Sequence, residues 1–168
     1  MALIGAALAA GGLGFLAWNW PPAKIFMGDA GSTVLGYALA VLPLLLVVEA
    51  RGAVKFERVL MAGALVVWPF LADGSFTILR RLRNGENIFR AHRSHLYQRL
   101  VMAGVSHRSV TLIYGALAVG GAGLAWRVLA GAPYSMATAL GLTSGAFVLL
   151  CWWVSRREGR GAVGSVER

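Results

Sequence analysis

Cysteine and acidic residues are both scarce in this sequence of 168 residues. Cys151 is the only cysteine, so no intramolecular disulfide can form and no cysteine-based metal site can be built. Seven Asp and Glu stand against sixteen Lys and Arg, which gives a formal net charge of +9. In a soluble protein this excess would suggest nucleic acid, but here the basic residues stand between apolar runs, as the positive-inside rule of membrane proteins predicts. We therefore expect no nucleic-acid partner.

Long apolar runs dominate the chain instead. Hydrophobic residues make up 58% of the sequence and the mean hydropathy is +0.67, values typical of membrane proteins. Five runs are long enough to cross a bilayer or nearly so: 1–17, 32–50, 59–79, 109–130 and 136–154. The sequence predicts an all-α, polytopic membrane helix bundle of about five transmembrane helices. We expect a membrane domain over residues 1–155, without a signal peptide, and a disordered cytoplasmic tail over 156–168.

The distribution of basic residues between the loops predicts the topology. Lys24, the seven arginines from Arg80 to Arg108 and the four arginines of the tail fall on one side, twelve in all. Four basic residues fall on the other side: Arg51, Lys55, Arg58 and Arg127. This asymmetry places residues 21–31, residues 80–108 and the C-terminus in the cytoplasm.

The first candidate site lies in PPAKIFMGDAGSTVLG, residues 21–36, between the first two apolar runs. Asp29 is flanked by Gly28 and Gly31 and precedes Ser32, which opens a helical run. A helix start offers free N–H groups to a phosphate, and a carboxylate is a hard oxygen ligand for a divalent cation. A helix cap explains the pattern equally well, with Asp29 or Ser32 accepting from free N–H groups. Lys24 either contacts phosphate beside Asp29 or only marks the cytoplasmic side.

The second candidate site is the polar segment 80–108, which contains His92, Arg93 and His95. Arg offers a bidentate fork to phosphate oxygens and neutral His can donate without a permanent charge, so the set suits a diphosphate. Contact with anionic lipid head groups is the alternative, and it explains the arginines better than the histidines. The two histidines could also bind zinc, but the ligand set is incomplete. Ser94 is expected to cap a short amphipathic helix that Gly104 ends.

Asp73 is the only acidic residue within the third apolar run, about six residues before Arg80. Charged groups within membrane spans are costly and usually face the protein interior. Thr77 lies on the same face of the helix, four residues further on. We expect Asp73 to play a supporting role at the site, with pairing to Arg80 or Arg81, or to fix the end of the helix.

Both stretches resemble the C-terminal half of the polyprenyl-phosphate N-acetylhexosamine-1-phosphate transferases of glycosyltransferase family 4. PAKIFMGDAGSTVLG matches the Asp motif of that family, and DGSFTILRRLRNGENIFRAHRSHLYQRL resembles its last large cytoplasmic loop. The His-Arg-Ser-His form is closest to the branch that initiates O-antigen. The resemblance covers nearly the whole chain.

The resemblance implies transfer of an N-acetylaminosugar 1-phosphate from a UDP-sugar to undecaprenyl or another polyprenyl phosphate, with release of UMP. Magnesium, or manganese in its place, would bind Asp29, with Gly28, Gly31, Ser32 and Lys24 around the substrate. His92, Arg93 and His95 would bind the diphosphate and the sugar of the nucleotide. The location implied is the bacterial inner membrane, with the active face cytoplasmic.

The family also carries a paired-Asp motif in an N-terminal half, and this sequence contains no Asp-Asp pair. We therefore expect a truncated chain that is inactive alone and needs a missing N-terminal half as its partner. The alternative function is that of a non-catalytic membrane protein that binds anionic lipid or assembles with a glycan-export complex. A transporter is disfavoured because inverted repeats and several intramembrane charges are lacking.

Overall fold

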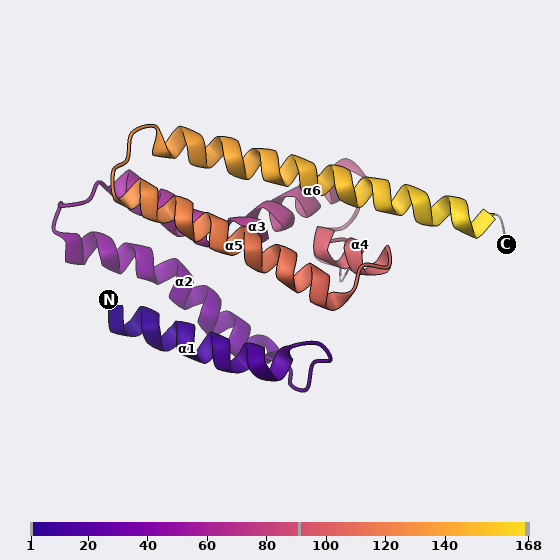
Figure 1. Cartoon of the computed structure of the whole chain (residues 1–168), viewed down its shortest axis with the longest axis horizontal. Helices are drawn as coiled ribbons and strands as arrows, with labels where there is room; N and C mark the ends of the chain where they lie inside the picture. The colour runs from indigo at the N-terminus through magenta and orange to yellow at the C-terminus, as the bar shows by residue number, and fades with distance from the viewer. Residues whose placement is uncertain (1, 91, 167–168) are drawn as a thin grey trace.

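The computed structural model describes the backbone of residues 2–90 and 92–166, and the side chains of these residues as far as Glu158. Within that part of the chain every regular element is a helix (Figure 1). The helices are α1 (Ala2–Asn19), α2 (Gly28–Ala50), α3 (Phe56–Arg83), α4 (Leu96–Met102), α5 (His107–Leu129) and α6 (Ser135–Val166). All but α4 contain a stretch long and apolar enough to span a bilayer. The all-α bundle of five spanning helices is confirmed.

Helix α2 begins earlier than the sequence predicted, at Gly28 instead of residue 32. The extended segment after Pro22 ends at Gly28, whose φ of 67° glycine adopts without a Cβ penalty. Asp29 then falls in the first helical turn, where a negative charge is favourable because of the free N–H groups there. The expected loop around Asp29, from Gly28 to Ser32, is therefore helix.

Helix α3 is the central element of the bundle and contacts α2, α4, α5 and α6. Its 28 residues give a length of about 42 Å, more than the roughly 30 Å hydrocarbon core. The excess is the polar end, where Arg80, Arg81 and Arg83 lie beside the last carbonyl groups and favour continuation of the helix. Asn84 caps this end and Gly85, at a φ of 69°, turns the chain away. The segment that carries the histidines begins at this helix end.

Two glycines allow the helices around α3 to approach closely. A Cβ at Gly121 of α5 would collide with the backbone oxygen of Leu65 and with the indole of Trp68. The Trp68 indole N–H also donates to the carbonyl of Leu117 at 3.1 Å, which ties α3 to α5. On the other side, Gly63 of α3 leaves room for the ring of Pro43, so the proline expected inside the second span is accommodated.

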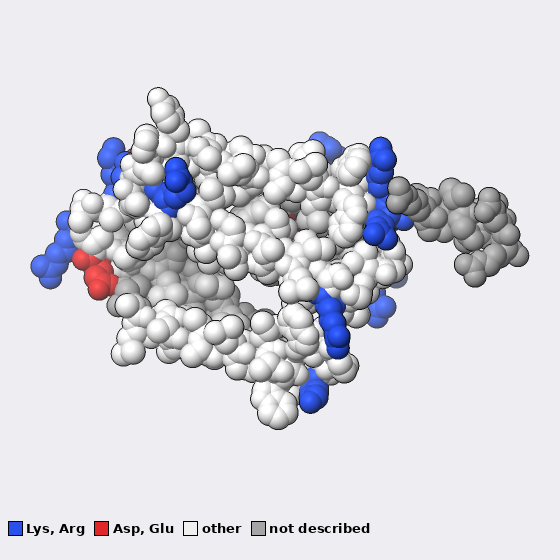
Figure 2. All heavy atoms as spheres, in the orientation of Figure 1, with Lys and Arg blue, Asp and Glu red and all other residues white. Residues whose placement is uncertain are grey.

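The outer surface of the helices is apolar. Neither α1 nor α2 has a buried residue among those described, and large side chains such as Leu3 and Val119 are exposed. Figure 2 shows basic side chains near the two ends of the helices, with an uncharged belt between them. This distribution is that of a protein whose middle faces lipid or other apolar partners.

The two candidate sites lie toward the same end of the bundle. Figure 1 places the α1–α2 connection near the start of α5, with α4 at this end too. The Arg108 Nε donates to the carbonyl of Pro21 at 3.0 Å, which joins the two segments directly. Away from these two segments, the Arg58 guanidinium at the start of α3 lies against Gly131 in the α5–α6 connection. The grouping of basic segments used to predict the topology therefore corresponds to two ends of one bundle.

The tail remains a prediction. Helix α6 extends to Val166, but side chains beyond Glu158 lie outside the described residues. The disorder expected for residues 156–168 is thus not tested.

Replacement of Gly121 by Ala should destabilise the fold, because the added methyl meets backbone and a large indole. We expect a loss of about 1–3 kcal/mol, measured as a lower melting temperature in detergent. Gly115→Ala is the matched control on the same helix, since nothing lies within 4 Å of a Cβ there. Its helix propensity should leave stability equal or slightly raised. Equal destabilisation by both changes would contradict the close contact of α3 and α5.

Candidate functional site

The Asp29 carboxylate is exposed at the start of α2 and makes no capping hydrogen bond there. The N-cap position is Met27, and no side chain caps the helix. Ser32 does not act as a cap either, since its hydroxyl donates back to the backbone carbonyl of Asp29 at 3.1 Å. The alternative in which Asp29 or Ser32 caps the helix is therefore wrong, and the carboxylate is left accessible to a ligand.

The neighbours of Asp29 shape this turn. Gly28 supplies the positive φ already described, and Gly31 packs against Met27, whose Cγ would lie 2.6 Å from an added Cβ. The ammonium group of Lys24 lies 5.7 Å from the centre of the Trp18 ring, a cation–π contact. Lys24 is thus directed to an aromatic face.

Asp29 fits the role of one metal ligand and no more. Among the described residues, no group of three His, Cys, Asp or Glu side chains is arranged to hold a metal ion. Magnesium requires near-octahedral oxygen coordination, and a single carboxylate supplies only part of it. The described residues alone do not form a complete magnesium site.

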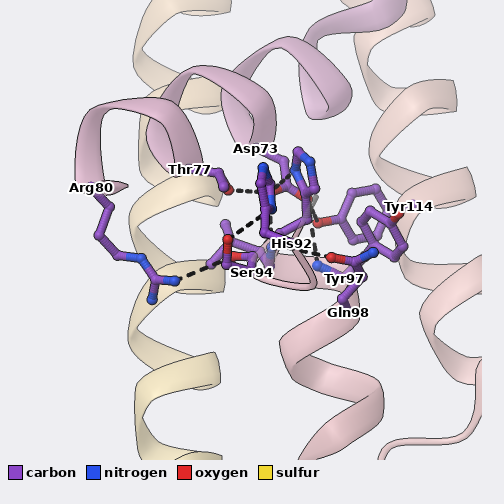
Figure 3. Close-up of polar contacts among 10 residues, drawn as sticks. Asp73, Thr77, Arg80, His92, Ser94, Tyr97, Gln98 and Tyr114 are labelled. Carbon is purple, nitrogen blue, oxygen red and sulfur yellow. Dashed lines mark hydrogen bonds and ion pairs between the residues drawn. The ribbon is translucent and has the colours of Figure 1, made fainter. Parts of the chain in front are cut away.

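The two histidines of the second site come together in the segment that precedes α4, where Figure 3 labels His92 and Ser94. The ring centres of His92 and His95 lie 5.2 Å apart. The Ser94 hydroxyl lies 2.9 Å from the Nδ1 of His92, and the backbone oxygen of Ser94 accepts from the Arg80 guanidinium at 3.5 Å. This group, which we call the histidine turn, consists of His92, Ser94, His95 and Arg80. It offers imidazole, hydroxyl and guanidinium groups to an anion.

Arg93 is exposed, whereas Arg80 supplies the guanidinium that contacts the histidine turn. Sequence reasoning selected Arg93 because it stands between the histidines, and considered Arg80 only as a partner for Asp73. The last turn of α3 brings Arg80 beside residues fourteen positions further along the chain. The chain direction there depends on the Gly85 turn, which local patterns do not reveal.

Asp73 is buried, with 2% of its surface exposed, and it joins three helices. Its Oδ1 accepts from the Leu96 N–H at 2.8 Å and from the Thr77 hydroxyl at 3.2 Å. Its Oδ2 accepts from the Tyr114 hydroxyl at 2.8 Å and from the Tyr97 N–H at 3.4 Å. The Nδ1 of His95 lies 3.4 Å from Oδ1. The supporting role expected for Asp73 therefore takes the form of an N-terminal cap on α4.

Two details of the expectation for this region are wrong. Asp73 does not pair with Arg80 or Arg81: Arg81 instead contacts the Glu86 carboxylate at 3.3 Å and donates to the Asn87 carbonyl at 2.7 Å. Helix α4 begins one residue later than a Ser94 cap would give, because the acceptor for its first N–H groups comes from α3. Gly104 does end α4 as expected, with a φ of 83°.

Burial and the positive charge of Arg81 lower the pKa of His92, with smaller contributions from His95 and Arg80. Glu86 acts in the opposite direction. His92 is therefore neutral near pH 7 and can use one ring nitrogen as donor and the other as acceptor.

The charges around His92 lead to a titration experiment. Glu86→Gln should lower the pKa of His92 further, because it removes a carboxylate that favours the imidazolium. Arg80→Gln should raise it, since a repelling cation is lost. The titration midpoint of labelled His92, followed by NMR in detergent, measures both changes. A shift of the same sign in the two variants would contradict the arrangement of charges described here.

Asp29 and the histidine turn do not touch among the described residues, although both lie toward one end of the bundle. Sequence reasoning thus found both groups but missed Asp73 as a cap and Tyr114 altogether. Thr77, four residues after Asp73, was the only local signal of a buried polar cluster. Tyr114 is forty-one residues away, and only the packing of α3 on α5 brings its hydroxyl to Asp73.

A family profile and several curated proteins match parts of this chain. The sequence profile described as glycosyl transferase family 4 matches residues 1–47. A probable undecaprenyl-phosphate N-acetylglucosaminyl 1-phosphate transferase of Bacillus subtilis is 44% identical over 103 residues, 61% of this chain and 28% of that protein. A decaprenyl-phosphate N-acetylglucosaminephosphotransferase of Mycobacterium leprae is 36% identical over 124 residues, 67% of this chain and 30% of that protein. No solved structure matches.

A third relative extends the same result. The undecaprenyl-phosphate alpha-N-acetylglucosaminyl 1-phosphate transferase of Haemophilus influenzae is 36% identical over 93 residues, 55% of this chain and 25% of that protein. The chain therefore spans about a third or less of the length of the curated relatives it matches. These matches confirm the resemblance carried by the two loop motifs: the chain is a relative of the polyprenyl-phosphate N-acetylhexosamine-1-phosphate transferases of glycosyl transferase family 4.

Proposed function

We propose that this chain carries part of the site that transfers an N-acetylaminosugar 1-phosphate from a UDP-sugar to undecaprenyl or another polyprenyl phosphate. An oxygen of the lipid phosphate forms a bond to the sugar-bearing phosphorus of the nucleotide. The bond from that phosphorus to the bridging oxygen breaks, and UMP leaves with the electron pair. The observation that carries the proposal is the histidine turn toward the same end of an apolar helix bundle as an exposed Asp29 carboxylate.

The reaction brings two anions together, so binding groups that neutralise charge matter more than covalent chemistry. His92, His95 and Arg80 would bind the diphosphate, and Arg93 and Lys24 lie in the same two segments as further cationic groups. Gly28, Gly31 and Ser32 would form the wall of the substrate site beside Asp29. Asp29 would supply one carboxylate ligand to magnesium, or to manganese, and the ion would neutralise phosphate charge. Its other ligands would come from an N-terminal half of a family transferase, which is the partner we propose.

The location we propose is the bacterial inner membrane, with the site on the cytoplasmic face and the C-terminus on the same side. The excess of basic residues in segments 21–31 and 80–108 supports this orientation. A lipid phosphate reaches its acceptor position only where a site opens at the membrane surface. The end of the bundle that carries the histidine turn would meet this requirement, because α3 is longer than the hydrocarbon core.

The glycan that we propose is O-antigen of lipopolysaccharide. The support is the His-Arg-Ser-His form of residues 92–95. UDP-N-acetylglucosamine is the first donor to test, since the relatives' names refer to N-acetylglucosamine.

Asp29→Asn should abolish most of the activity, because the amide cannot replace a carboxylate toward a divalent cation. The chain is produced in membranes together with the part of the Bacillus subtilis relative that lies outside the match. UMP release from UDP-N-acetylglucosamine is then measured with Mg²⁺ and with a chelator. We expect a fall of about a hundredfold or more in the variant, similar to the loss on chelation.

Lys55→Gln is the matched control, since it removes an exposed charge from the α2–α3 connection, far from Asp29 along the chain. It should leave UMP release unchanged. Full activity in Asp29→Asn would contradict the role proposed for this residue. Absence of Mg²⁺-dependent UDP-sugar binding in all preparations, with retained binding to anionic vesicles, would favour the alternative of a non-catalytic lipid-binding protein.

A further inference from the structure

Asp73 has no part in the proposed chemistry, yet it is the most deeply buried carboxylate among the described residues. Transfer of a carboxylate out of water is costly unless hydrogen bonds compensate for the lost solvation. Four donors do so here, from α3, α4 and α5. A buried charge of this kind is weak evidence for stability, because an apolar side chain of similar volume often stabilises a protein as well. What an apolar side chain would not supply is an acceptor for backbone N–H groups.

The acceptor serves the start of α4. This helix has only seven residues and would not persist alone in water, so its orientation depends on tertiary contacts. Leu96 and Leu100 anchor its apolar face in the core, and the Arg99 guanidinium forms two hydrogen bonds to Glu158 of α6, at 2.7 and 2.6 Å. Asp73 holds the opposite end through the Leu96 N–H.

His95 stands at the cap position immediately before that N–H. Its backbone N–H donates to the side-chain oxygen of Gln98 at 3.3 Å and not to Asp73. Its ring stacks on the Tyr97 ring, with 5.7 Å between the ring centres. The Nδ1 of the ring lies near the carboxylate, and 32% of the side chain remains exposed. A displacement of the first turn of α4 would therefore also move the His95 imidazole.

We propose that Asp73 is a positioning residue for the histidine turn. Its carboxylate caps α4 and so sets the place of the His95 imidazole relative to His92 and Arg80. The consequence for catalysis rests on the proposed function, because it requires that His95 binds the diphosphate. The positioning itself does not depend on that function and can be measured separately.

The test compares the reaction of individual histidines with diethyl pyrocarbonate in the purified chain in bilayers, followed by mass spectrometry. His107, on the first turn of α5, serves as the internal reference. Asp73→Leu removes the acceptor and retains apolar volume, so modification of His95 relative to His107 should rise about tenfold. Asp73→Asn retains one acceptor oxygen and should lie between this variant and the wild type.

Tyr114→Phe is the matched control, because it removes a hydrogen bond to the same carboxylate but keeps the ring beside Tyr97 and leaves the Leu96 and Tyr97 N–H groups with their acceptor. It should leave the ratio of His95 to His107 unchanged. An equal rise in Tyr114→Phe, or a wild-type ratio in Asp73→Asn, would overturn the proposal. If Asp73→Leu does not accumulate, Asp73→Asn alone decides, with a rise of about threefold expected.

A second measurement separates failure of this inference from failure of the proposed function. UDP-N-acetylglucosamine with Mg²⁺ should protect His95 in the wild type when the remaining part of the transferase is present. In that preparation Asp73→Asn should raise KM for the nucleotide sugar about tenfold, with a smaller change in kcat. Absence of protection in the wild type would contradict the function and leave the positioning intact. An unchanged KM in a variant with increased modification of His95 relative to His107 would contradict the proposal that the position of His95 affects binding of the nucleotide sugar.

Discussion

The buried carboxylate of Asp73 is the interaction on which the arrangement of the functional end depends. A single side chain of α3 accepts hydrogen bonds from the backbone of α4 and from the hydroxyl of Tyr114 on α5. The carboxylate is tolerated in the interior because its two oxygens accept hydrogen bonds from four donors. Removal of a donor or of the acceptor would leave a buried polar group unpaired. The first turn of α4, which follows the histidines, is thus held to α3 inside the bundle.

Helix α3 makes this possible because it is both the centre of the packing and longer than the hydrocarbon core. Glycines at the contacts with α2 and α5 let neighbouring helices approach its backbone, and apolar side chains fill the rest of the interface. Its polar end then carries Arg80 and Arg81 to the region where α4 lies. Helix α3 therefore both packs against its neighbours in the apolar part of the bundle and carries the arginines at its polar end.

Much of the fold could be predicted from the sequence, but the partners of its polar groups could not. Apolar runs are a local signal, so all five spanning helices were found with boundaries close to those observed. The start of α2 was placed too late because Gly28 and Ser32 look like a turn and a cap, although the positive φ of Gly28 only begins the helix. Asp73 was recognised as interior, yet its donors Leu96 and Tyr114 lie 23 and 41 residues away. Arg80 was passed over in favour of Arg93 for the same reason: proximity in space at a helix end differs from proximity along the chain.

The function proposed here requires that the histidine turn binds the diphosphate of a nucleotide sugar. Dipolar recoupling between phosphorus and labelled histidine nitrogens in bilayers measures this most directly, with UDP-N-acetylglucosamine bound in the presence of the rest of the transferase. We expect coupling of phosphorus to the rings of His92 and His95 and none to His107. Coupling absent from both His92 and His95 in a preparation that binds the nucleotide would contradict it.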